Sequence, residues 1–150
     1  MLFCLLLAPA AMAQDAMPHR TLKPNLTILM DEDLILPTAA LARNYAKSTH
    51  TPLTTVVRNP DTENEIGQGL EAHLILSADN ALIERLAAQG LTDVSSIHVF
   101  AQSSDDIGKS YFVAVLASES MDDARSFVSF LDSKPAQELL KKTGLKATEK

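Results

Sequence analysis

The sequence is poor in aromatic and basic residues and contains a single cysteine, and each shortage argues against a class of function. Its 150 residues include no Trp, and the 13 Lys and Arg residues are outnumbered by 19 Asp and Glu, which gives a formal net charge of −6. Proteins that bind nucleic acid or an anionic membrane usually present a basic surface, so this charge argues against both partners. The single cysteine, Cys4, has no second cysteine with which to form a disulfide.

Residues 1–13 are predicted to be a signal peptide. They carry no charge, and they combine the apolar run Leu2–Leu7 with the small-residue ending Ala11-Met12-Ala13. This pattern is typical of secretory signal peptides, and the run is too short to span a bilayer. The alternative interpretation is a short buried apolar strand. Cleavage would remove Cys4, and we expect no part of the mature chain to enter the membrane.

The rest of the chain is predicted to be a flexible leader over 14–24 and one α/β domain over 25–150. Short apolar runs alternate with amphipathic stretches of helical period, which is typical of α/β domains. Residues 58–65 are predicted to be a polar connection with a turn at Asn59-Pro60-Asp61. The predicted strands are Leu26–Met30, Leu53–Val57, His73–Ser77, Ile97–Ala101 and Tyr111–Leu116. The predicted helices are about Leu36–Lys47, Asn80–Ala88, Met121–Leu131, and a last helix that begins at Ser133.

These elements predict a three-layer sandwich with a mostly parallel five-stranded sheet and one antiparallel strand. Only Gln102–Ser110 joins the last two strands, and a parallel crossover needs a dozen or more residues, so we expect an antiparallel hairpin there. Asp79 is expected to cap the helix that follows it, and Gly90 to end that helix. Ser120, with Asp123 three residues later, resembles a capping box.

Three stretches of the chain resemble one protein family. The Ile66–Asp79 stretch, IGQGLEAHLILSAD, resembles the family pattern I-E-Q-G-A-P-A-D-V-F-I-S-A-D. Ala124–Gly144 follows A-x-x-F-x-x-F-L-x-S-P-x-A-Q-x-x-L-x-x-x-G, and Leu26–Met30 is similar to the opening L-T-V-F-A. The family is that of the type II periplasmic solute-binding proteins that deliver molybdate and similar oxyanions to ABC importers. In that family a second lobe lies where this chain has only residues 92–110.

The resemblance implies a single lobe of the type II periplasmic-binding fold and a function in binding rather than catalysis. The expected protein is a periplasmic substrate-binding component, with a small oxyanion or other small ligand and with an ABC permease or a second copy as partner. The alternative is a protein-interaction or scaffold module that kept the fold and lost small-molecule binding. A weaker third possibility is a fragment without a selected function.

The candidate ligand-binding residues follow the first three predicted strands, at the carboxyl edge where open α/β sheets bind ligands. In the family, serines after strands one and two hold the oxyanion. Here the first serine's place falls on Asp33, and the second falls on Arg58 or Asn59. Carboxylates repel a dianion by about 4 kcal/mol per unit pair at about 4 Å near a protein surface. The full predicted set is Asp31, Asp33, Arg58, Asn59, Ser77 and Asp79.

The same acidic residues have a plainer interpretation, in which Asp33 and Asp79 cap helices and the other carboxylates are solvated. No motif indicates catalysis, because Ser77-Ala78-Asp79 is not a nucleophile elbow and Gly67-x-Gly69 lacks the remaining glycines of a phosphate loop. The four histidines form no HxxxH or HExxH pair. The sequence therefore predicts no catalytic residue, no metal ligand and no cofactor.

Overall fold

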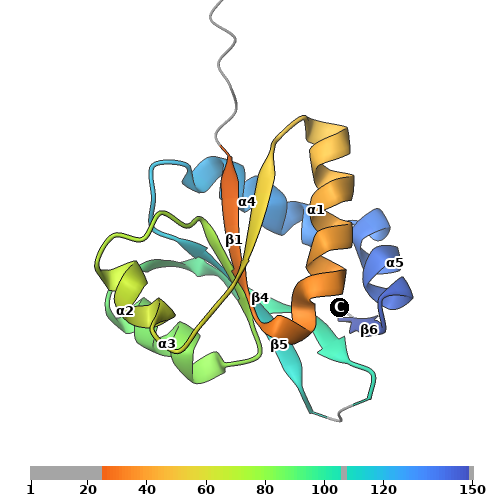
Figure 1. Cartoon of the computed structure of the whole chain (residues 1–150). Coiled ribbons are helices and arrows are strands. Elements are labelled where there is room, and N and C mark those ends of the chain that lie inside the picture. Colours follow the sequence, from red (N-terminus) through yellow and green to blue (C-terminus); the bar gives the residue numbers. More distant parts are fainter. Residues whose placement is uncertain (1–24, 106–107, 149–150) are drawn as a thin grey trace, which may run out of the picture.

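The computed structural model describes residues 25–105 and 108–148, which form one six-stranded sheet with helices on both faces (Figure 1). The predicted signal peptide and leader lie outside the described residues. The strands are β1 (Leu26–Met30), β2 (Leu53–Val57), β3 (Leu74–Ser77), β4 (Thr92–Ser103), β5 (Ser110–Leu116) and β6 (Leu145–Ala147). The helices are the 3₁₀ turn η1 (Glu32–Leu34), α1 (Ile35–Thr49), α2 (Thr62–Gly67), α3 (Asn80–Ala88), α4 (Met121–Leu131) and α5 (Lys134–Lys142).

The strand order is β2-β1-β3-β5-β4-β6, and the sheet is mixed. Only the β1–β2 and β1–β3 pairs are parallel; the β3–β5, β4–β5 and β4–β6 pairs are antiparallel. The predicted α/β fold is present, and β5 runs antiparallel to β1–β4 as predicted. The sheet nevertheless has six strands instead of five, and β6 is a second strand that runs against those four, so the sheet is mixed rather than mostly parallel. The short β6 follows Gly144, which adopts a φ of +88°. Three residues are too few for an alternating pattern to be visible in the sequence.

The predicted antiparallel hairpin is confirmed, because β4 and β5 pair in antiparallel orientation, from Thr92 opposite Leu116 to Gln102 opposite Ser110. Strand β4 is much longer than the predicted Ile97–Ala101. Register shifts interrupt the β4–β5 pairing between Asp93 and His98 and again between Val99 and Ala101. These register shifts break the alternation of buried and exposed residues, so the first half of β4 does not show the period of a strand in the sequence.

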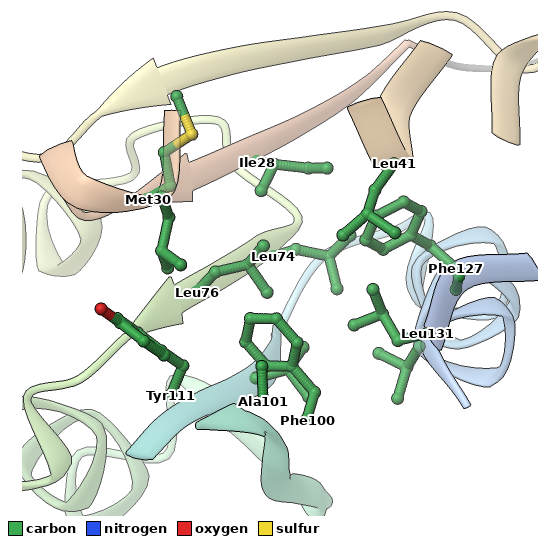
Figure 2. Packing of buried hydrophobic residues seen from close by; sticks show 14 of the residues in the cluster. Ile28, Met30, Leu41, Leu74, Leu76, Phe100, Ala101, Tyr111, Phe127 and Leu131 are labelled. Atoms are coloured by element: carbon green, nitrogen blue, oxygen red, sulfur yellow. The ribbon is translucent and has the colours of Figure 1, made fainter. Parts of the chain in front are cut away.

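Alternating side chains of the central strands fill two separate cores. Ile28 and Leu74 point to the face that α1, α4 and α5 cover, and Figure 2 shows them packed towards Leu41 and Phe127 from those helices. Leu29 on β1 points to the other face, where it packs with residues from α2 and α3. The predicted three-layer arrangement is therefore present in the described residues (Figure 1).

The helix ends show which local signals were reliable. The Asp79 carboxylate caps α3 by accepting a hydrogen bond from the Leu82 N–H at 3.0 Å, as predicted, and Gly90 follows the helix with a φ of +73°. Ser120 makes no side-chain cap at α4, so the predicted capping box is wrong. The α2 helix was also missed, because it is only six residues long and Ile66 is its single buried large apolar residue.

We predict that Phe127→Ala destabilises the fold by about 3–5 kcal/mol, since it would leave a cavity in the larger core. Phe127 is fully buried and stacks edge-on against Tyr45 with ring centroids 5.2 Å apart. Urea unfolding followed by circular dichroism measures the effect. Phe130→Ala is the matched control and should cost less, because Phe130 is only partly buried. Equal losses for the two variants would contradict this assignment of the core.

Candidate functional site

The ends of three adjacent strands bring a carboxylate, a guanidinium and a hydroxyl together. Asp31 directly follows β1, Arg58 follows β2 and Ser77 is the last residue of β3. The Asp31 carboxylate accepts hydrogen bonds from Ser77 Oγ at 2.9 and 3.0 Å and from the Ala78 N–H at 2.8 Å. It also forms an ion pair with Arg58 Nε. The side chains of Asp31 and Arg58 are only 14% and 25% exposed, so this cluster is largely removed from water.

Asp79 extends the cluster towards α3. Its N–H donates to Ser77 Oγ at 3.0 Å, so the Ser77 hydroxyl both donates and accepts. One Asp79 oxygen caps α3, and the other lies 3.9 Å from Arg58 Nη2. Arg58 therefore stands between two carboxylates.

An open hollow of about 450 Å³ lies beside this cluster. Among its lining residues are four carboxylates and two guanidinium groups, so four negative and two positive charges leave a net charge of −2. Asn59 lines it too, but its side chain mainly builds the turn before α2, where Oδ1 accepts from the Asp61 N–H at 2.8 Å. The lining residues are Asp31, Glu32, Arg58, Asn59, Pro60, Thr62, Glu63, Asp79, Leu82 and Arg85.

Asp33 is not among the residues that line this hollow, and its predicted capping role is wrong. The residue before α1 is Leu34, and no side chain caps that helix. The Asp33 carboxylate instead accepts hydrogen bonds from Lys109 Nζ at 2.6 Å and from the Tyr111 hydroxyl at 2.5 Å. Burial alone would raise the pKa of Asp33, but the hydrogen bonds from Lys109 and Tyr111 outweigh it and lower the pKa below its ordinary value.

The site residues predicted from the sequence did not include Glu63 or Arg85, which also line the hollow. Glu63 on α2 pairs with Arg85 on α3, with Arg85 Nε and a Glu63 oxygen 3.0 Å apart. Glu63 was hidden because α2 was interpreted as a polar connection. Thr62 and Ile66 are both buried in the structure, and their spacing of one helical turn was the signal in the sequence that could have indicated α2.

Among the described residues, no three His, Cys, Asp or Glu side chains are arranged to hold a metal ion. None of the helices in that part of the chain has the length and apolar character needed to cross a bilayer.

We predict that Asp33 contributes to stability in a pH-dependent way. Because the folded-state pKa of Asp33 is lowered, its contribution is present above the unfolded-state pKa of about 3.9 and disappears as the pH falls through the folded-state value. Asp33→Asn should therefore cost about 0.5–1 kcal/mol at pH 7, a small value because the pair is partly exposed, and less at pH 2, where the carboxylate is losing its charge. Urea unfolding at the two pH values measures this difference. Tyr111→Phe should lose part of the same effect, and a cost independent of pH would contradict the explanation.

Comparison with known proteins shows the fold but not the ligand. No protein-family model matches the sequence, and no curated protein is similar to it in sequence. A substrate-binding domain described for a molybdenum ABC transporter of Clostridium difficile has a TM-score of 0.74 at 14% identity, covering 83% of this chain and 99% of that one. The periplasmic molybdate-binding protein of Azotobacter vinelandii has a TM-score of 0.73 at 10% identity, covering 83% and 100%.

A third similar structure is PEB3 of Campylobacter jejuni, with a TM-score of 0.64 at 11% identity, covering 83% of this chain and 100% of PEB3. The match extends over nearly the whole of all three structures. The resemblance to molybdate-binding proteins expected from the sequence is confirmed at the level of structure. The chain has the fold of these substrate-binding domains.

Proposed function

We propose that this chain is a periplasmic binding component of the solute-binding type, and that it holds a small ligand in the hollow at the carboxyl edge of β1, β2 and β3. The observation that carries the proposal is the convergence of charged side chains from these strand ends and from α2 and α3 on one cavity. Open α/β sheets bind ligands in this position. The similar proteins include a molybdate-binding protein and PEB3, which has been crystallised with L-phospholactate.

In this proposal residues 25–150 act as one lobe, with no second lobe to close over the ligand. The contact between Lys109 and Asp33 supports this arrangement, because it fastens the β4–β5 hairpin to the segment that follows β1. In this proposal the hairpin takes the place of the second lobe that the resemblance to the molybdate-binding family implies. An open site buries little of a ligand, so affinity would be modest unless an ABC permease or a second copy covers the hollow.

The charge of the hollow favours a ligand that carries a cationic group. A dianion would meet four carboxylates and only two guanidinium groups, and both of these are already paired with carboxylates. Within the part of the chain that the structure describes, Glu32 has no ion-pair partner. Glu32 and the outer oxygen of Asp79 are therefore the groups to which an ammonium group would bind.

We predict that small amines raise the melting temperature of the protein and that dianions do not. Putrescine and lysine are the amine probes, and molybdate, tungstate and sulfate are the dianions, each compared with sodium chloride at equal ionic strength. A ligand that binds only the folded state stabilises it by about 2.7 kcal/mol at 100 times its Kd. Thermal unfolding followed by circular dichroism measures the shift.

The matched variants are Glu32→Gln, inside the hollow, and Glu119→Gln, outside it. Both residues are exposed, so neither change should alter stability by more than about 0.5 kcal/mol. Only Glu32→Gln should weaken amine binding. The proposed site is wrong if no probe shifts the melting temperature, or if the two variants respond alike.

The second candidate function, a protein-interaction module, is favoured by β2. This strand lies at the edge of the sheet, pairs only with β1 and carries no charged residue. Val56 and Val57 are 43% and 42% exposed. Unprotected edges of this kind are templates for pairing with another strand, and β2 of a second copy is the partner in this case.

If this module is the function, we predict that the protein is a dimer that Val56→Lys converts to a monomer. A lysine on an edge strand opposes edge-to-edge pairing through its charge and the solvation it requires. Light scattering measures the mass, and Val94→Lys is the control because Val94 is 66% exposed on β4. A wild-type protein that is monomeric at all concentrations excludes the dimer.

A further inference from the structure

We propose that Asp31 is a built-in anion that occupies a small-anion site of the protein itself. The site, called here the internal anion site, consists of the Ser77 hydroxyl, the Ala78 N–H and the Arg58 guanidinium. The carboxylate of Asp31 fills this site, and it thereby prevents a free oxyanion from binding there. This inference concerns donors next to the hollow and does not depend on the hollow binding any ligand.

The donors around Asp31 are those that proteins use for free anions. A hydroxyl and a backbone N–H contact the carboxylate at 2.8–3.0 Å, and a guanidinium pairs with it. Charge-assisted bonds of this kind, including bonds from backbone N–H groups, hold bound carboxylates and phosphates. Ser77 is fully buried, so its hydroxyl cannot turn to bulk water in place of the carboxylate.

The Ser77 hydroxyl and the backbone of Arg58 are held in place by contacts that do not involve the carboxylate, and the Arg58 guanidinium also lies 3.9 Å from an Asp79 oxygen. Ser77 Oγ accepts a hydrogen bond from the Asp79 N–H at 3.0 Å, and the Arg58 N–H donates to the Met30 carbonyl at 2.9 Å. The Asp31 N–H donates to the Leu76 carbonyl at 3.1 Å, so the backbone of Asp31 is also fixed independently of its side chain. Removal of the carboxylate should therefore leave a preformed site with unsatisfied donors rather than a collapsed loop.

The occupied site has a consequence for specificity. A second anion would have to displace Asp31 or to approach its charge closely, and repulsion between unit charges near a protein surface is about 4 kcal/mol at about 4 Å. Asp31 therefore excludes small oxyanions from these donors. The charge of a ligand in the hollow then depends on the outer carboxylates, Glu32 and Asp79.

The test is chemical rescue of Asp31→Ala with formate. This substitution deletes a carboxylate, and formate is a free carboxylate of the same size. Sodium formate is titrated against Asp31→Ala, the wild type and Asp33→Ala, with sodium chloride at equal ionic strength as reference. We expect Asp31→Ala to melt at a lower temperature than wild type and to be stabilised by formate in a saturable way, with an affinity at least about tenfold above that of wild type. Asp33→Ala changes the net charge equally at the same edge and should show no such response.

Two further variants distinguish occupancy of the site from a general effect of charge. Asp31→Asn removes the negative charge but keeps the site filled, so it should not respond to formate. Asp31→Ala combined with Ser77→Ala should lose the response, because the hydroxyl donor is gone. The proposal is overturned if wild type and Asp31→Ala bind formate equally, or if Asp31→Asn responds as strongly as Asp31→Ala. It is also overturned if Asp31→Ala gains nothing, including the case in which the chain stays unfolded at every formate concentration.

The result can be separated from that of the amine titration. Rescue by formate without any amine binding would leave the internal anion site standing and remove the proposed ligand of the hollow. Amine binding without rescue by formate would support the proposed ligand of the hollow and overturn the internal anion site.

Discussion

The bonds of the Asp31 carboxylate are the interaction on which the rest of the site depends. They connect the ends of β1, β2 and β3, three strands whose sequence positions are far apart. A carboxylate that is mostly removed from water costs several kcal/mol unless its charge is paired and its oxygens are hydrogen-bonded. Both Asp31 oxygens have donors here, because Arg58 Nε pairs with Oδ1 and the Ala78 N–H donates to Oδ2. Removing the carboxylate would leave the Ser77 hydroxyl, the Ala78 N–H and the Arg58 guanidinium without their common acceptor.

The register of the sheet explains why these residues meet. Met30 is opposite Val57 on one neighbouring strand and opposite Leu76 on the other. The next residue on each strand is Asp31, Arg58 or Ser77, so the three polar groups come level at the same edge. The register is in turn fixed by the alternation of Ile28, Leu29 and Met30 between the two cores, since a slip by one residue would turn every side chain to the wrong face. Apolar packing thus positions the charged site.

The sequence predicted what depends on local pattern and missed what depends on distant contacts. Strands β1, β2 and β3, helices α3 and α4, and the hairpin follow from periodicity and loop length. Four of the six candidate residues, Asp31, Arg58, Ser77 and Asp79, contact one another in the structure. The role of Asp33 could not be predicted, because its partner Tyr111 is 78 positions away and belongs to an antiparallel strand. Similarly, β6 and α2 are too short to show a period, and their stability comes from the elements they pack against.

Different residues determine the fold of this protein and the charge at the carboxyl edge of its sheet. A TM-score of 0.73 at 10% identity to a molybdate-binding protein means that a similar backbone forms from largely different side chains. Many sequences satisfy the same alternation of apolar residues, since cores tolerate substitution that keeps volume and pattern. The charge at the carboxyl edge of the sheet rests on a few side chains, and these are not interchangeable. A carboxylate such as Asp31, placed among a hydroxyl, a backbone N–H and a guanidinium, changes the charge of the edge although it leaves the backbone as it was. The apolar pattern therefore determines the fold, and a few polar residues determine the electrostatics of the edge.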